Sequence, residues 1–466
     1  MLTTRTPRFR PESLQTLKLA LPLALGQLAQ VGMGLTDTIM LGALGGEAIA
    51  AGGLASGLYF ILAMIMQGPA SAVAILVAHA RGAEAPERIA PAVRAGLVLA
   101  LGAIVPLGLI LWNIEPFLLM LGEPPRLTAD MAAYARVLSL GAPALMMVST
   151  LRVFLAAMHH PRVVMTVAFG GLLMNGLLNY ALIHGHWGMP QLGFLGSAAA
   201  TSITTWTTLT ATYIWTRFIP DATIHVRRGP IDMALVREMF HLGWPIAITF
   251  AVEALLFLSS GLMMGLIGTT EVAAHQVTLN VASTTFMVPL AFSNAANVRV
   301  GFHMGAGNPA AARMAGLVAF ALGVGFMAVA AVVMFAAPVQ LAILFNLDPA
   351  DAEDAAVIAV IVRLMMVGAF FQVFDGAQSI AVGALRGLKD TRIPMWLAGA
   401  GYWGIGFPTA WLLGFPLGVG PSGIWWGLAV GLAVVAAVLC VRFLKITARM
   451  TAEARTQMAP GHSAVI

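Results

Sequence analysis

The sequence has very little charge for its length. Asp, Glu, Lys and Arg make up 10% of its 466 residues, whereas an average soluble protein has about 25%. Hydrophobic residues make up 59%. A chain with so few charges cannot cover a water-facing surface with polar groups, so we expect lipid to be its solvent. The low charge therefore predicts an all-α polytopic membrane protein.

Other absences narrow the function. Cys440 is the single cysteine, which excludes a disulfide framework within the chain. The sequence has no phosphate-binding loop, no Ser/His/Asp arrangement and no soluble domain large enough to hydrolyse ATP. Basic residues fall at segment ends rather than on one patch, so nucleic acid is not an expected partner. We expect no enzyme activity and no cofactor, and any pumping must draw on an ion gradient.

Long apolar stretches predict twelve transmembrane helices, because a membrane-spanning helix needs about 20 mostly apolar residues. Five prolines lie in or near these stretches and are expected to bend them: Pro22, Pro69, Pro143, Pro289 and Pro408. The stretches cover residues 14–40, 53–78, 93–112, 131–155, 163–183, 193–216, 240–267, 272–299, 314–336, 356–384, 394–414 and 421–444.

Lys and Arg are concentrated on the membrane face that holds the N-terminus. All of them except Arg126, Arg136 and Arg363 fall before or near the start of the first span, near or after the end of the last, or near loops that follow even-numbered spans. Arg299 and Arg386 are counted among these loop residues. Because cytoplasmic loops carry most Lys and Arg, we expect both termini in the cytoplasm.

The two halves of the chain repeat each other. With a shift of 223 residues, "LGALGGEAIAA" (41–51) aligns with "MGLIGTTEVAA" (264–274). Each half has six spans, so both halves enter the membrane from the same side. This predicts two six-helix bundles related by a pseudo-two-fold axis along the membrane normal, an architecture suited to alternating access. We expect an N-terminal bundle at 1–216, a cytoplasmic linker at 217–239, a C-terminal bundle at 240–445 and a cytoplasmic tail at 446–466.

Only three acidic residues lie within apolar spans: Asp37, Glu253 and Asp375. A charge at a helix centre costs about 2.5–3.5 kcal/mol on insertion scales and usually marks an ion or substrate path. Arg363, on the same span as Asp375, lies about three turns away, too far for a direct pair. No structural cation is therefore expected for the pair of Glu253 and Asp375. The alternatives are a structural role and, for Asp37, solvation at the outer end of its helix.

The three acids are the predicted binding groups for a coupling ion. A carboxylate can take up a proton or ligate a small hard cation such as Na⁺. Either event removes a buried charge and can shift the balance between two packings of the protein. Apart from Na⁺ at Glu253 and Asp375, we expect no metal site.

Six uncharged polar side chains on the spans are candidates for lining a cavity near these acids. Two pairs have a spacing of four residues, which places each pair on one helix face, and a third pair precedes Asp37. Such groups either line a cavity or hydrogen-bond between helices at about 0.6–2 kcal/mol. The six are Asn175 and Asn179, Gln276 and Asn280, and Gln27 and Gln30.

Three long motifs fall in the first, eighth and tenth spans: "QLAQVGMGLTDTIMLG" (27–42), "VAAHQVTLNVASTTFMVPL" (272–290) and "DGAQSIAVGALRGLKDT" (375–391). These motifs resemble the MATE family (multidrug and toxic compound extrusion), of NorM type, and the resemblance covers nearly the whole chain. It implies a secondary active antiporter of the bacterial inner membrane, which exports cationic amphipathic compounds in exchange for Na⁺ or H⁺.

The resemblance also assigns individual residues. The family's acids of the first, seventh and tenth spans match Asp37, Glu253 and Asp375, and its paired Asn residues of the fifth span match Asn175 and Asn179. Similar proteins have an aromatic hydroxyl one turn before the tenth-span Asp. This chain has Phe371 at that position, which removes one ligand for a cation.

Two other functions were weighed against the antiporter. A lipid-linked oligosaccharide flippase of the same superfamily tends to have a more cationic cavity and extra spans, whereas this chain has three acids and twelve spans. A membrane-embedded transferase would need a polar catalytic cluster or a sizeable loop at one interface, and the sequence has neither. We expect the partners to be small cationic molecules and the lipid bilayer, and the protein to be a monomer.

Overall fold

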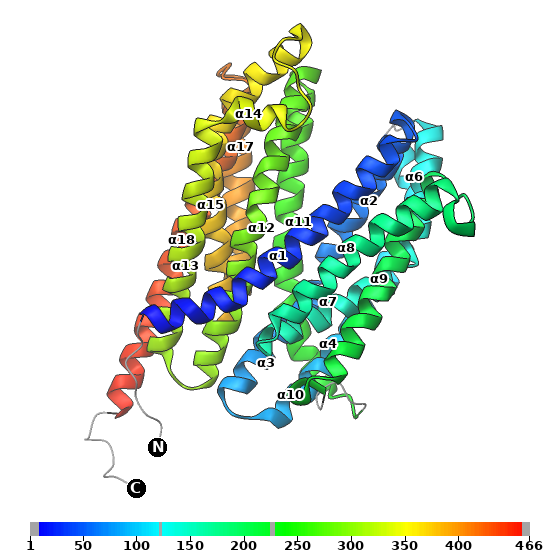
Figure 1. Cartoon of the computed structure of the whole chain (residues 1–466). Coiled ribbons are helices and arrows are strands. Elements are labelled where there is room, and N and C mark those ends of the chain that lie inside the picture. The colour runs from blue at the N-terminus through cyan, green and yellow to red at the C-terminus, as the bar shows by residue number, and fades with distance from the viewer. Residues whose placement is uncertain (1–8, 121–123, 224–228, 459–466) are drawn as a thin grey trace. The chain divides into compact units, whose positions relative to one another are not determined.

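The described part of the chain is helical throughout. The computed structural model describes residues 9–120, 124–223 and 229–458, and every regular element within these ranges is a helix (Figure 1). The all-α class predicted from the apolar stretches is confirmed.

Most of the predicted spans are long apolar helices. Among the described residues, eight helices are long and apolar enough to cross a membrane. A ninth span arises if α6 (Pro125–Ser139) and α7 (Ala142–Ala157), which meet at a 51° bend, count as one. The eight are α1 (Phe9–Gly42), α2 (Gly46–Met66), α4 (Ile89–Trp112, preceded by the 3₁₀ turn η1 at Pro86–Arg88), α8 (Pro161–His184), α11 (Met233–Gly265), α13 (Pro309–Ala336), α15 (Ala352–Gly387) and α18 (Pro421–Met458).

The other three predicted spans coincide with helices that are more polar or broken. α9 (Phe194–Arg217) is rich in Thr, and α12 (Thr269–Gly305) carries His, Gln and Asn side chains. The eleventh predicted span is divided into α16 (Arg392–Gly401), the π-helical turn η4 (Tyr402–Gly406) and α17 (Phe407–Gly414). The remaining short helices are α3 (Gly68–Gly82), α5 (Ile114–Met120), η2 (His186–Gly188), α10 (Pro220–Thr223) and α14 (Pro338–Ile343).

Three of the five prolines lie beside breaks between helices, as expected, and two lie within continuous helices. Pro69 follows the break between α2 and α3, Pro143 follows the 51° bend between α6 and α7, and Pro408 follows η4. Pro22 and Pro289 lie inside α1 and α12. Proline lacks a backbone donor and clashes with the preceding turn, so it bends or ends a helix.

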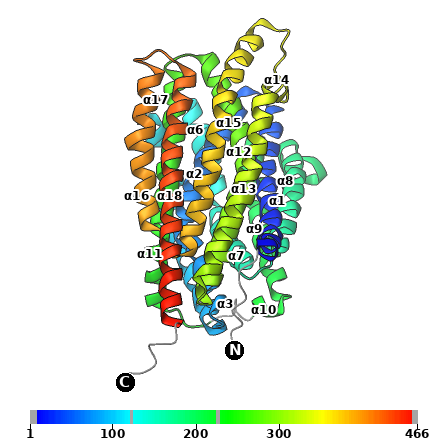
Figure 2. The same cartoon turned by 90° about the vertical axis from the view of Figure 1, so that its left-hand side faces the viewer.

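The chain forms two compact units. The N-terminal unit consists of residues 25–81 and 85–250, and the described part of the C-terminal unit consists of residues 9–24, 82–84 and 251–458. Within the N-terminal unit, α2 packs against α6, α4 against α7, and α8 against α9. Within the C-terminal unit, α15 packs against α12, α13 and α18 (Figure 2).

Two helices contribute to both units. The first part of α1, up to Ala24, belongs to the C-terminal unit, and the rest belongs to the N-terminal unit. Similarly, α11 belongs to the N-terminal unit up to Phe250 and to the C-terminal unit from Ala251. The predicted bundles at 1–216 and 240–445 instead assign each of these helices to a single bundle, because sequence repeats mark the order of spans and not their packing.

The predicted linker and tail are partly helical. α11 begins at Met233, within the predicted linker 217–239, and α18 continues to Met458, within the predicted tail 446–466. Residues 224–228 and 459–466 of these segments lie outside the described residues, as do Arg5 and Arg8 of the N-terminal segment.

Candidate functional site

Asp37 lies on α1 in the N-terminal unit, and its carboxylate receives hydrogen bonds from two neighbouring helices. Asn179 Nδ2 donates to Asp37 Oδ1 at 2.7 Å, and Asn175 Nδ2 donates to the same oxygen at 3.1 Å. The spacing of four residues on α8 directs both amides to one side of the helix. Asp37 is 6% exposed. The structure thus brings together the predicted group of Asp37, Asn175 and Asn179, and it does not place Asp37 in solvent.

The helix α9 adds hydroxyl groups that sequence analysis missed. Thr201 donates its hydroxyl to Asp37 Oδ2 at 2.8 Å and accepts from Asn175 Nδ2 at 3.3 Å. Ser197, one turn earlier on α9, accepts from the Tyr134 hydroxyl at 3.2 Å. Donors from α8 and α9 therefore surround both oxygens of the carboxylate.

The amide oxygens of this group are unsatisfied. Asn175 Oδ1 and Asn179 Oδ1 are buried and have no hydrogen-bond partner within the described ranges. A carboxylate beside two free amide oxygens offers the oxygen ligands that a small hard cation prefers. The group can therefore hold either a proton on Asp37 or a small cation.

Glu253 on α11 and Asp375 on α15 form the second acidic group, in the C-terminal unit. The two carboxylates are close enough to interact electrostatically. Asp375 is 6% exposed, and its Oδ1 has no hydrogen-bond partner in the part of the chain that the structure describes. The two acids predicted to bind a coupling ion thus lie within electrostatic range of each other.

Two further charged or polar groups interact with this pair. Arg386, in the last turn of α15, interacts electrostatically with Glu253. Tyr402, at the start of η4, lies within electrostatic range of both Glu253 and Asp375. The expectation of no cation for the pair is therefore wrong for Glu253. It failed because Arg386 was assigned to a loop, whereas α15 continues to Gly387.

The turn before Asp375 is aromatic and polar. Phe371 is buried, and its ring lies edge-on to Trp425 with 5.2 Å between ring centroids. Gln372 Oε1 accepts from the Thr285 hydroxyl at 2.9 Å, while Gln372 Nε2 is buried and has no partner among the described residues. This site therefore has an unpaired amide donor and an unpaired carboxylate oxygen.

The other four predicted polar residues do not join either acidic group. Gln27 and Gln30 are half-buried on α1, whereas Gln276 and Asn280 are exposed on α12. In the described ranges, none of these four side chains hydrogen-bonds one of the three acids. Their helical spacing was read correctly, but spacing alone does not say which neighbour a helix face meets.

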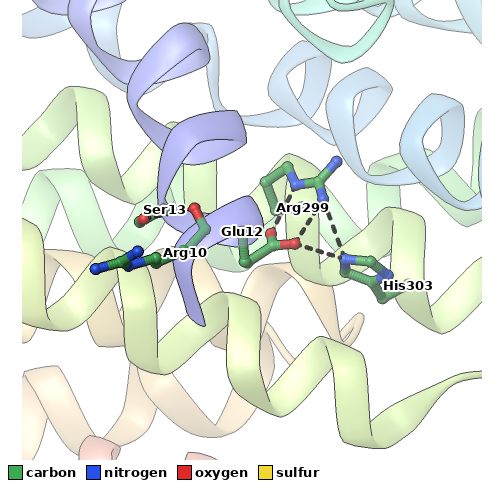
Figure 3. Close-up of polar contacts among 5 residues, drawn as sticks. All are labelled: Arg10, Glu12, Ser13, Arg299 and His303. Carbon is green, nitrogen blue, oxygen red and sulfur yellow. Dashed lines mark hydrogen bonds and ion pairs between the residues drawn. The ribbon is translucent and has the colours of Figure 1, made fainter. Parts of the chain in front are cut away.

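A third polar cluster was not predicted. Figure 3 shows Glu12, near the start of α1, between Arg299 and His303 of α12, all within the C-terminal unit. Arg299 Nε and Nη2 donate to the two Glu12 carboxylate oxygens at 2.8 Å and 2.7 Å, and His303 Nε2 lies 3.2 Å from Glu12 Oε2. Arg299 is 7% exposed and lies inside α12, so its assignment to a loop is wrong.

Comparison with known proteins places the fold and the two acidic groups in context. The MatE family model matches residues 22–181 and 245–412. Multidrug resistance protein NorM from Burkholderia vietnamiensis is 45% identical over 452 residues, which cover 96% of this chain and 97% of that protein. Probable multidrug resistance protein NorM from Pseudomonas putida is 40% identical over 430 residues, 92% of this chain and 93% of that protein.

A solved structure shows the same fold. The crystal structure of the eukaryotic MATE transporter AtDTX14 superposes with a TM-score of 0.85 and 22% sequence identity, covering 96% of this chain and 99% of that chain. The family model includes Asp37, Glu253 and Asp375 in its two matched segments. The chain therefore belongs to the MATE family, whose members are multi-pass membrane transporters and not enzymes.

Proposed function

We propose that this protein is a secondary active multidrug efflux antiporter that exports cationic amphipathic compounds in exchange for Na⁺ or H⁺ by alternating access. Two relatives that match almost the whole chain, at 45% and 40% identity, carry the name multidrug resistance protein NorM. The observation that carries the proposal is the presence of three acids within the apolar helices α1, α11 and α15, of which Asp37 and Asp375 are buried and Glu253 is half-buried.

The coupling ion is assigned to Glu253 and Asp375. Two carboxylates that interact in a low-dielectric interior repel each other, and binding of a proton or Na⁺ relieves the repulsion. Bound ion can drive transport only if it binds more tightly to one conformation than to the other. The ion relieves the repulsion only in a conformation in which it can reach the two carboxylates. A site that ions can reach in one conformation and not in the other therefore favours one conformation when the ion is bound.

Asp37 is assigned to the cationic substrate or to a proton. Its donors come from fixed positions on α8 and α9, so the carboxylate keeps its orientation when it is ionised. An ionised, oriented carboxylate in an apolar environment attracts an organic cation strongly. Protonation of Asp37 would remove that attraction and release the cation.

Transport in proteoliposomes tests the proposal directly. The purified protein is reconstituted, and export of a cationic dye is followed under an imposed Na⁺ gradient alone and under an imposed pH gradient alone. We expect efflux under at least one gradient and none without a gradient. Absence of efflux under both gradients, with protein shown to be folded and inserted, would contradict the proposal.

We also propose that the protein lies in the bacterial inner membrane with both termini in the cytoplasm. A cysteine-free background is made by Cys440→Ala, and single cysteines are then introduced by Glu87→Cys or Ala350→Cys, both at exposed positions. An impermeant thiol reagent added to intact cells should label position 350 and leave position 87 unlabelled. Labelling of position 87 from outside would reverse the orientation.

A further inference from the structure

Tyr402 is a fully buried tyrosine whose hydroxyl has no hydrogen-bond partner in the described ranges. Its exposed fraction is 0%, and it is the first residue of the π-helical turn η4. A buried tyrosine hydroxyl usually finds a partner, and burying a polar group without one costs about 1–3 kcal/mol. Phenylalanine would fill the same space without that cost, so the hydroxyl requires an explanation other than packing.

The surroundings of Tyr402 point to the acid pair. Tyr402 lies within electrostatic range of both Glu253 and Asp375. The adjacent residue, Trp403, donates its Nε1 to the backbone oxygen of Val252 at 3.3 Å. Because Val252 directly precedes Glu253, this hydrogen bond fixes the start of η4 beside the part of α11 that carries the acid.

Two more unpaired polar atoms belong to the same site. Asp375 Oδ1 and Gln372 Nε2 are buried and, like the Tyr402 hydroxyl, have no partner among the described residues. Gln372 and Asp375 are three residues apart on α15, so their side chains lie on neighbouring positions of one helix face. Helix α15 and the turn η4 thus each contribute buried polar groups that have no partner in the described residues, and both Tyr402 and Asp375 lie within electrostatic range of Glu253 on α11.

The backbone of η4 is held closely by α18. A Cβ at Gly431 of α18 would lie 2.7 Å from the Cα of Gly406, and a Cβ at Gly427 would contact the backbone of Ala410. These glycines let the two helices approach closely. A π-helical turn changes the direction of the side chains around it, and such turns are frequent at functional sites. The close packing of α18 therefore holds the backbone at the end of η4 and in the following helix α17 (Phe407–Gly414).

We propose that the hydroxyl oxygen of Tyr402 is a neutral ligand for a Na⁺ ion held by Glu253 and Asp375. The inference rests on the proposed function, because it adds a residue to the proposed coupling site. Hard cations prefer oxygen ligands, and a neutral oxygen adds coordination without adding a third negative charge. On α15 the position one turn before Asp375 is occupied by Phe371, which packs on Trp425 and has no oxygen to offer. Tyr402 supplies the hydroxyl from a different helix.

Tyr402→Phe tests this inference, because it removes only the hydroxyl. The matched control is Tyr59→Phe, which changes a buried tyrosine of the N-terminal unit. Binding of ²²Na⁺ to the purified full-length protein and Na⁺-driven efflux in proteoliposomes are both measured. We expect Tyr402→Phe to raise the half-saturating Na⁺ concentration about five- to tenfold and to leave maximal efflux at saturating Na⁺ unchanged. Tyr59→Phe should change neither quantity.

Three results would overturn the inference. An unchanged half-saturating Na⁺ concentration in folded Tyr402→Phe would exclude the hydroxyl as a ligand. A lower unfolding temperature of Tyr402→Phe in Na⁺-free buffer would assign the hydroxyl a structural role. Wild-type protein that binds no Na⁺ but exports dye under a pH gradient would remove the Na⁺ site and leave the proposed function standing. Wild-type protein that exports under neither gradient would instead contradict the proposed function itself.

Discussion

Asp37 in the N-terminal unit receives hydrogen bonds from Asn175, Asn179 and Thr201, whereas Asp375 in the C-terminal unit has an oxygen without a partner in the described residues. The first group contains one carboxylate. The second contains Asp375 and Glu253, which lie within electrostatic range of each other, and Arg386 interacts electrostatically with Glu253. The two units of one chain therefore bury negative charge under different conditions.

The difference indicates that the acidic groups of the two units have different functions in transport. A carboxylate that already accepts several hydrogen bonds from fixed donors is stable when ionised and gains less from a bound ion. Two carboxylates with an unsatisfied oxygen gain more, because an ion relieves both the repulsion and the missing hydrogen bond. We therefore expect ion dependence to reside mainly in the C-terminal unit, and substrate dependence in the N-terminal unit.

The largest expected effect comes from neutralising the acid pair. Glu253→Gln and Asp375→Asn should each abolish gradient-driven efflux in proteoliposomes, because an amide imitates a permanently neutral carboxyl group. Binding of substrate, measured separately by fluorescence anisotropy, should remain. Glu47→Gln serves as the control, since Glu47 forms an exposed ion pair with Arg126, and such pairs contribute little. Full efflux by either variant, shown to be folded, would mean that the substituted acid is not part of the coupling site.

Asp37→Asn should abolish dye export through the acidic group of the N-terminal unit. The amide can still accept from Asn175 or Asn179 through its oxygen and donate to the Thr201 hydroxyl, so we expect the protein to fold. It loses the negative charge, and the accumulation of a cationic dye in intact cells should rise to the level of cells without the transporter. Wild-type dye export by this variant would leave Asp37 a structural residue.

Substitutions of Thr201 test whether a single hydrogen-bond donor to Asp37 is needed for dye export. Thr201→Val has nearly the same shape but no hydroxyl, whereas Thr201→Ser keeps the hydroxyl that donates to Asp37 Oδ2. We expect Thr201→Val to lower dye export several-fold and Thr201→Ser to retain most of it. Interhelical hydrogen bonds in membranes contribute about 0.6–2 kcal/mol, which is enough for such an effect. Equal export by the two variants would show that the hydroxyl is dispensable.

The smallest effect on transport is expected from the Glu12 cluster. Glu12→Gln removes the charge that Arg299 binds through two nitrogens, and breaking a buried ion pair is destabilising. The unfolding temperature in detergent should fall, while the half-saturating Na⁺ concentration should stay unchanged. Glu453→Gln, in an exposed pair with Arg449, is the control and should alter neither. A changed Na⁺ dependence in Glu12→Gln would mean that ion binding is sensitive to packing outside the acid pair.

Much of the fold could be predicted because lipid imposes a simple rule. No predicted span extends more than two residues beyond the helix or broken helix on which it lies, although several helices are longer than predicted. A chain in lipid must satisfy its backbone hydrogen bonds within each segment, which is why apolar stretches are helical. The assignment of α1 and α11 to two units could not be predicted. Hydropathy measures how apolar a segment is, and it contains no information about which neighbours that segment packs against.

The site residues could be predicted where the energetic cost of a charge in an apolar span, or the helical spacing of polar residues, singled them out. Asp37, Glu253 and Asp375 were identified because charge in an apolar span is expensive, and Asn175 with Asn179 because their spacing places them on one face. Thr201 was missed because α9 contains many Thr residues and nothing in the sequence singles out the one beside Asp37. Tyr402 was missed because a π-helical turn interrupts the regular spacing on which such reasoning depends.

The shared membership of α1 has a consequence for the order in which the protein is made. Glu12 is among the first described residues to be synthesised, yet Arg299 and His303 follow it by 287 and 291 residues. Ribosomes add about 5–20 residues per second, so Glu12 waits at least about 15 seconds for its partners. During that interval the start of α1 is already in place while most of its own compact unit does not yet exist. The C-terminal unit is therefore completed late, around a helix that is synthesised long before the rest of that unit.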